Sequence, residues 1–243
     1  MVQPSSGIDT DTLGTFTGEQ PRKGSQLDAA MTKAKLGCEL NQTRYGLGSE
    51  GSFGPDPYMG VSAWGIEMLA LWDSEKNYGV HAMVQGPQTN FAHETVASWQ
   101  QAEAFAKTAG FPLHGVIVGK PGQEVFHKTL QSWPALQESV TQGLARGPVW
   151  LETDMRAHRN PSRMAMIAKT AQALAERLAK ACPACGLPGF GPQAMVPGAL
   201  CSTCQQPTQS ARAQVLACNC CNFKQEEPIR SHVSADRCQF CNP

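Results

Sequence analysis

The sequence predicts an α/β protein in which a mixed sheet is flanked by helices and followed by a small cysteine-rich module. Through the first 181 residues, short apolar runs typical of strands alternate with amphipathic helix patterns, as in proteins whose helices cover a sheet. Nine of the ten cysteines lie beyond residue 181, which indicates a boundary there. We therefore expect a core domain over residues 1–181 and a second module over residues 182–243.

The composition argues against several classes of protein. The 243 residues include 20 basic and 20 acidic side chains, so no global charge favours nucleic acid. The first residues lack the basic and apolar segments of an export signal, and no apolar run approaches the roughly 20 residues that a membrane span needs. We expect a cytoplasmic protein, in which thiols stay reduced and clustered cysteine pairs indicate bound metal.

The core is expected to begin with a helix that Ser25 caps and that Gly37 ends, with Asp28 at its third position. The glycines and prolines of residues 49–57 are expected to form a loop without regular structure. The turn-like residues 73–77 are expected to join an antiparallel strand pair. The expected strands are residues 45–49, 66–72, 78–84, 113–118 and 149–151.

Three more helices are expected in the core. One spans residues 93–109, and another opens at Ser132 with Pro134 near its first turn. The clearest helix follows Asn160, a good N-cap residue, and has Pro161 at its first position. Its apolar face carries Met164, Ile167, Ala171, Leu174 and Leu178.

The cysteines form four pairs in which two residues separate the two sulfurs: Cys182 and Cys185, Cys201 and Cys204, Cys218 and Cys221, and Cys238 and Cys241. Such a turn aims both sulfurs at one ion, and two turns complete a site of four thiolates. Fifteen residues separate the first two pairs and sixteen the last two, which fits zinc ribbons. The sequence therefore predicts a double zinc-ribbon-like module with two structural zinc ions.

Several features of this module stay open at the level of sequence. We prefer sequential pairing, the first pair with the second and the third with the fourth, while a cross-braced arrangement of alternate pairs is the alternative. Cys220 either replaces Cys218 or Cys221 or remains a free thiol. Disulfides, and iron in the same geometry, are the alternatives to zinc. Cys38, alone in the core, is interpreted as a small buried residue.

A cluster of charged residues precedes the last core helix. Helix N-termini attract anions, and arginine adds bidentate hydrogen bonds, so a phosphate or carboxylate is the expected ligand. In an extended segment Asp154, Arg156 and His158 would share one side and converge on that ligand. The alternative is a capped, solvated helix start in which Asp154 pairs with an arginine. The cluster includes Asp154, Arg156, His158, Arg159, Asn160 and Arg163.

A second polar cluster lies near the N-terminus. Its oxygen-bearing side chains, together with Glu50, could bind Mg²⁺. Turn formation is the alternative interpretation. The residues are Asp9, Asp11, Thr15, Thr17, Glu19 and Arg22.

Four segments together resemble an uncharacterised bacterial family that is defined by a domain of unknown function. They are residues 9–19, residues 49–54, residues 154–158 with Asn160 and Pro161, and the final Cys-x2-Cys-Asn-Pro. The resemblance implies a shared architecture. Members of the family usually start earlier, with a strand and a His-Gly-Lys-Glu segment, so we expect either an upstream start codon or the loss of part of the sheet.

Three shorter matches resemble the inosine/xanthosine triphosphate pyrophosphatase fold. They are Lys33-Ala34, Glu50 and Ala157-His158-Arg159, in that order. The resemblance implies that Glu50 helps to hold Mg²⁺ or activate water, while basic residues contact phosphates or base. We name Glu50, Asp154 and His158 as candidate catalytic residues. The candidate substrate-binding residues are Lys33, Arg156, Arg159, Asn160 and Arg163.

Two functions therefore compete. In the first, the core binds a phosphorylated or anionic small molecule and acts as a Mg²⁺-dependent nucleotide hydrolase. In the second, the protein is a non-enzymatic adaptor whose zinc module binds nucleic acid or a protein partner. A closed shell of four thiolates leaves no position for water, so in either case the zinc is expected to be structural.

Overall fold

A computed structural model describes residues 24–119 and 127–242. The predicted polar cluster between Asp9 and Arg22 lies outside these residues. The chain divides into two compact units: Met1–Lys76 with His81–Ala173, and Asn77–Val80 with Leu174–Pro243. The predicted boundary between residues 181 and 182 stays a prediction.

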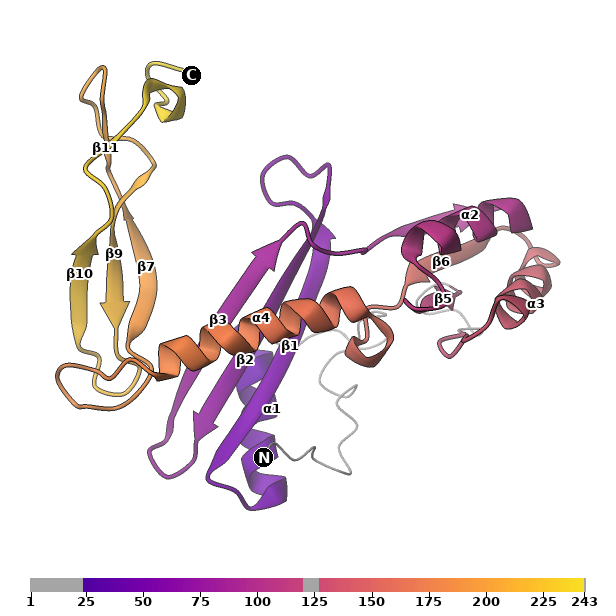
Figure 1. Ribbon diagram of the computed structural model, residues 1–243, viewed down its shortest axis with the longest axis horizontal. Helices are drawn as coiled ribbons and strands as arrows, with labels where there is room; N and C mark the ends of the chain where they lie inside the picture. The colour runs from indigo at the N-terminus through magenta and orange to yellow at the C-terminus, as the bar shows by residue number, and fades with distance from the viewer. Residues whose placement is uncertain (1–23, 120–126, 243) are drawn as a thin grey trace. The chain divides into compact units, whose positions relative to one another are not determined.

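The first unit begins with helix α1, Gln26–Asn41, followed by an antiparallel sheet in the order β1-β2-β3 (Figure 1). The strands are β1, Tyr45–Pro55, β2, Ala63–Asp73, and β3, Tyr78–Gly86. Ser25 and Asp28 form the predicted capping box. The helix continues four residues past Gly37, because the left-handed conformation that ends it is adopted by Gln42, at φ 49°.

Strand β1 continues through most of the segment that was expected to be a loop, so that prediction was wrong. Its glycines permit a close approach of α1. A Cβ on Gly46 would lie 1.9 Å from the Ala34 carbonyl oxygen, and one on Gly48 would lie 2.0 Å from the Ala30 carbonyl oxygen. In this strand glycine therefore indicates close helix-sheet packing.

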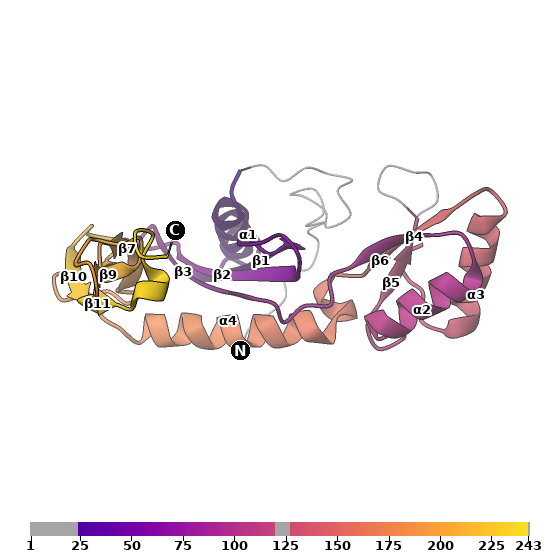
Figure 2. The ribbon, with the colours of Figure 1, turned by 90° about the horizontal axis from the view of Figure 1, so that it is seen from above.

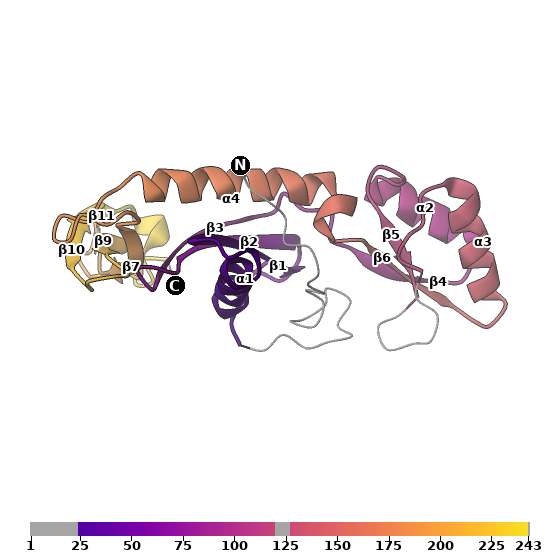
Figure 3. The ribbon, with the colours of Figure 1, turned by 90° about the horizontal axis from the view of Figure 1, so that it is seen from below.

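Helices cover both faces of this sheet. Ala30 and Ala34 of α1 pack on Met68 and Ala70 of β2. Helix α4, Pro161–Leu178, begins at the opposite face, where a Cβ on Gly65 would lie 3.2 Å from Met166 Sδ (Figures 2 and 3). The sheet is thus the middle layer of the unit.

The rest of the first unit is a second antiparallel sheet, in the order β4-β6-β5, with helices α2 and α3 on one face. The expected helix over residues 93–109 starts only at Trp99, because Ser98 caps it and the residues before it form β4. The α3 start at Ser132 is as predicted. The elements are β4, His93–Val96, α2, Trp99–Ala109, β5, Val116–Val118, α3, Trp133–Leu144, and β6, Val149–Thr153.

The predicted α/β class with flanking helices is confirmed. The described strand pairs of the core are antiparallel and belong to two sheets, whereas we expected one mixed sheet. Short connections between β1, β2 and β3 explain this, since only antiparallel neighbours can be joined by tight loops. The α4 start is also as predicted, because Asn160 Oδ1 accepts a hydrogen bond of 3.0 Å from the Arg163 N–H.

The second unit holds a three-stranded antiparallel sheet, in the order β10-β9-β7, and a short parallel pair, β8 with β11. The strands are β7, Gly191–Pro197, β8, Leu200–Cys201, β9, Ala211–Ala217, β10, Lys224–Pro228, and β11, His232–Val233. In the described part of the chain, no helix combines the length and the apolar character that crossing a bilayer requires.

Candidate metal centres

The eight paired cysteines gather into two groups of four in the second unit. Each group combines alternate pairs, so the preferred sequential pairing was wrong and the cross-braced alternative is the arrangement found. The first cluster is Cys182, Cys185, Cys218 and Cys221, and the second is Cys201, Cys204, Cys238 and Cys241.

Strand register explains why alternate pairs meet. In the sheet, Gly191 at the start of β7 lies opposite Ala217 at the end of β9. The first cysteine pair, just before β7, and the third cysteine pair, just after β9, are therefore neighbours. In the parallel pair, Cys201 of β8 lies opposite Val233 of β11, which brings the second and fourth cysteine pairs together. The long-range pairing of strands therefore decides the ligand sets, and cysteine spacing alone does not report it.

Each cysteine pair is built on the same turn. The N–H of the residue after the second cysteine donates to the carbonyl of the first cysteine, at 2.8–3.1 Å in all four pairs. Three of these residues have a positive φ, which glycine and asparagine tolerate best. They are Gly186, Gln205 and Asn222, at 72°, 59° and 58°.

The sulfur separations fit a tetrahedral ion. The sulfurs of each cluster all lie within 4.8 Å of one another, and the closest contacts between pairs are 3.7 Å in the first cluster and 3.6–3.8 Å in the second. A tetrahedron with metal-sulfur bonds of about 2.3 Å has edges of about 3.8 Å. A disulfide would need about 2.05 Å. Each cluster could therefore hold one metal ion at four sulfurs.

The clusters lie partly inside the unit. The first cysteine of every pair is at most 3 % exposed, whereas the second is intermediate or exposed. Cys182 and Cys218 pack against Phe190, with Leu216 and Phe223 beside them. In the first cluster, this packing buries the first cysteine of each of its two pairs among apolar side chains.

The thiols of a cluster differ in acidity. Backbone N–H groups of Cys204 and Thr203 lower the pKa of Cys201 to about 6. The Cys204 thiol and burial raise the pKa of Cys241 to about 12. In the first cluster burial raises the pKa of Cys182, but backbone N–H donors outweigh burial and lower this pKa to about 7. A cation is therefore needed before all four thiols of one cluster can ionise together.

Cys220 stands outside both clusters. Its side chain is exposed, and its backbone N–H donates to Cys218 Sγ at 3.4 Å. The third pair therefore contributes Cys218 and Cys221 to the cluster, and Cys220 replaces neither of them. In the described residues, no further group of three or more His, Cys, Asp or Glu side chains gathers closely enough to hold an ion.

The polar residues before α4 are held by contacts with one another and with backbone carbonyls. Asp154 is buried and forms an ion pair with Arg156, at 2.6 Å between Oδ2 and Nη2. His158 is exposed in a short 3-10 helix, Ala157–Arg159, so the expected extended conformation was wrong for residues 157–159, whereas Arg156 is extended. The guanidinium of Arg159 donates to the Leu130 carbonyl at 2.6 Å. Asn160 is fully buried and caps α4.

The other candidate site residues form two ion pairs on opposite faces of the first sheet. Lys33 and Glu50 pair at 2.6 Å on the α1 face. Arg163 and Glu67 pair at 2.5 Å on the α4 face, with side chains 6 % and 1 % exposed. Glu67 was missed by sequence reasoning, although a glutamate in an apolar strand is a signal for a buried partner. Roles of these residues in substrate binding or catalysis stay predictions.

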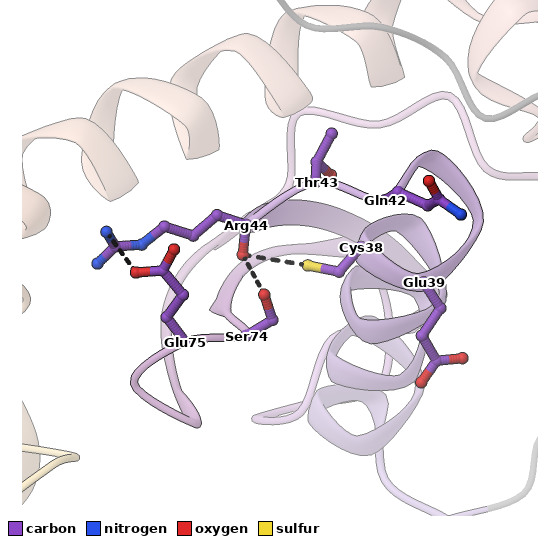
Figure 4. A pocket seen from close by; sticks show the side chains of 7 residues that line it. All are labelled: Cys38, Glu39, Gln42, Thr43, Arg44, Ser74 and Glu75. Atoms are coloured by element: carbon purple, nitrogen blue, oxygen red, sulfur yellow. Dashed lines mark hydrogen bonds and ion pairs between the residues drawn. The ribbon is translucent and has the colours of Figure 1, made fainter.

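An open pocket of about 390 Å³ lies beside the end of α1 and contains none of the predicted site residues (Figure 4). Cys38 Sγ lies 3.5 Å from the Arg44 carbonyl oxygen, which also accepts from Ser74 Oγ at 2.9 Å. Arg44 pairs with Glu75 at 2.8 Å. Cys38 is 5 % exposed, as expected of a small core residue.

Fold and site define the class of protein: an α/β protein whose C-terminal unit carries two four-cysteine groups, each able to hold a metal ion. Residues 33–243 match the family model DUF6671, described as a domain of unknown function. The chain therefore belongs to this family, and the predicted resemblance to such a family is confirmed. No curated protein and no solved structure matches the chain. The resemblance to the pyrophosphatase fold stays a prediction.

Proposed function

We propose that the C-terminal unit binds two zinc ions as structural metals, and that the folded unit serves as a non-enzymatic binding module of a cytoplasmic adaptor. The observation that carries the proposal is the closed set of four cysteine sulfurs in each cluster. Four thiolates fill the tetrahedral shell of Zn²⁺ and leave no position for water or substrate. The metal would therefore fold the module and take no part in chemistry.

Zinc suits these clusters for a further reason. Two of the five strands of this unit, β8 and β11, have two residues each, β10 is exposed along its whole length, and β7 is mostly exposed, so apolar burial contributes little to the stability of the unit. A structural zinc site contributes on the order of 10 kcal/mol of folding free energy. Two such sites would offset the entropy of ordering the unit, which its small apolar contacts do not.

The charges of the module favour a protein partner over nucleic acid. Arg212 pairs with Glu226 at 2.7 Å, and Gln214 donates to Glu227 at 2.6 Å. On β9 and β10 the cations Arg212 and Lys224 are matched in number by Glu226 and Glu227, so these strands carry no excess of positive charge. A surface that follows a phosphate backbone would need several unpaired cations. We expect the full chain to pass through DNA and RNA columns at about 0.1 M salt without retention. Retention that falls steeply with added salt would favour nucleic acid instead.

The experiment that tests the structural role is limited proteolysis with and without metal. Trypsin can cut the module after Arg212, Lys224, Arg230 and Arg237. The zinc-loaded chain is expected to resist cutting there, to become sensitive after chelation, and to recover when Zn²⁺ is restored. Equal resistance in the presence and absence of metal would contradict the proposal.

A further inference from the structure

The loop that joins β1 to β2 exposes three apolar side chains at its end. It spans Asp56 to Ser62, and it lies beyond the ends of the two strands (Figure 1). Tyr58, Met59 and Val61 are 78, 76 and 78 % exposed, more than any other large apolar side chain in the described part of the chain. We call these three residues the apolar tip.

The apolar tip is unusual because its exposed residues lie close together in the sequence. Single exposed apolar side chains are normal on protein surfaces. Here three of them fall within four consecutive positions of one loop, and exposed apolar side chains that gather in one place mark interaction sites. Tyrosine and methionine are also enriched where proteins meet.

The loop is held in one conformation by a buried carboxylate. Asp56 is 8 % exposed, and its two oxygens accept four backbone N–H groups of the loop at 2.7–3.1 Å. The N–H donors, those of Met59 and Ser62 first, hold the pKa of Asp56 well below its usual range, so the carboxylate stays ionised near neutral pH. The residues that donate are Tyr58, Met59, Val61 and Ser62.

Two further contacts fix the loop. The Asp56 N–H donates to the Ser62 carbonyl at 2.8 Å, which closes the base of the loop. The ring of Tyr58 meets Trp64 edge to face, with centroids 5.9 Å apart and planes at 85°. A preordered loop loses less conformational entropy on binding than a flexible one.

The sequence of the loop and of the adjoining strand ends contains almost no charge. From Gly51 to Ile66 the sequence has no Lys or Arg, and its one charged residue, Asp56, faces inward. Nothing in this segment would attract a phosphate backbone or an anionic lipid surface. A rigid, uncharged tip of defined shape is complementary to an apolar pocket in another protein.

We propose that the apolar tip is a docking element that inserts Tyr58, Met59 and Val61 into an apolar pocket of a protein partner. This surface belongs to the first unit and needs no metal. It is therefore independent of the function proposed for the cysteine clusters.

The test first captures the partner protein by crosslinking and then compares the affinity of that partner for the wild-type chain and for variants of the tip. The photo-crosslinking residue p-benzoylphenylalanine replaces Tyr58 in the full chain, and the captured protein is identified, purified and titrated against the wild-type chain. Val61→Asp is expected to weaken this binding by about 30-fold or more, as at a hot-spot position. Met83→Asp, at a residue 48 % exposed outside the loop, is the control and is expected to leave the Kd within about twofold.

A second variant separates the shape of the loop from its side chains. Asp56→Ala keeps the three tip side chains and removes the acceptor that orders them, so it is expected to weaken binding as well. Tryptophan fluorescence checks that the fold is retained, since all five tryptophans lie in the first unit. Zinc content should stay unchanged in every variant, so failure here is distinguishable from failure of the metal proposal.

Several results would overturn the docking proposal. These are the absence of any crosslinked partner, crosslinking only to a second copy of this chain, and binding of the purified partner that Val61→Asp leaves intact. Binding of the chain to phosphatidylcholine vesicles that is lost in Val61→Asp would assign the tip to a membrane surface and would also overturn it.

Discussion

Two double substitutions test the pairing of the cysteines around the metals. Cys185→Ser with Cys221→Ser removes two sulfurs from the first cluster and leaves the second complete. Cys185→Ser with Cys204→Ser removes one sulfur from each cluster. Both variants lose two thiols and differ only in whether the lost thiols come from one cluster or from both. Each variant is therefore a matched control for the other.

The expected metal content follows from comparing the entropy cost of closing the chain around the second cluster with the free energy that zinc binding contributes. The remaining cluster must close the 33 residues between Cys204 and Cys238. A chain-entropy estimate puts that closure at about 4 kcal/mol, well below the roughly 10 kcal/mol of a complete structural zinc site. One intact cluster should therefore keep its ion, while a cluster with three sulfurs binds far more weakly.

The assay is metal per chain, measured by mass spectrometry of the elements after passage through a weak chelator. We expect about one zinc ion in the Cys185→Ser, Cys221→Ser variant and close to none in the Cys185→Ser, Cys204→Ser variant. The reverse order would show that sequential pairs share each ion, and it would refute the reasoning from strand register.

Three further predictions concern the first unit and are read by tryptophan fluorescence during urea unfolding. Gly48→Ala should destabilise the unit by about 1–3 kcal/mol, because the new Cβ would lie 2.0 Å from a carbonyl oxygen of α1; an unchanged midpoint would contradict the close packing. Arg163→Met should cost about 3–5 kcal/mol, because it leaves Glu67 buried without its cation; the double change with Glu67→Leu should recover much of that loss. Hydrogen bonds from Arg44 lower the pKa of Asp73, so this carboxylate contributes stability above its unfolded pKa of about 3.9, and the contribution is lost as the pH falls through the lower folded value. Asp73→Asn should therefore reduce stability at pH 7 and flatten its decline below about pH 4, and parallel pH curves for both proteins would contradict this.

Local signals predicted much of the fold, since capping and periodicity act over a few residues. Ser25 with Asp28, Ser132 and Asn160 each start a helix where the sequence indicated. The glycines of β1 are an ambiguous local signal, because glycine permits both a loop and the close approach of a helix. Only the position of α1 in space distinguishes the two, and a residue such as Gly48 does not carry that information by itself.

The metal centres show the same limit. Spacing predicted that each cysteine pair would turn toward one ion, because the turn is local. Which cysteine pairs meet depends on the pairing of strand β7 with β9 and of β8 with β11. These strand pairings join residues that are far apart in the sequence. The charged cluster before α4 was predicted as one site because an extended segment was assumed. The 3-10 helix at Ala157–Arg159 ends the extended conformation before His158, while Asp154 and Arg156 do meet in an ion pair.

X-ray absorption at the zinc edge of the purified wild-type chain, with its metal content, tests the central claim most directly. Two cross-braced clusters predict two zinc ions per chain, each with four sulfur neighbours at about 2.3 Å. A chain that contains no metal while its module still resists trypsin, or zinc with nitrogen or oxygen among its ligands, would contradict the account.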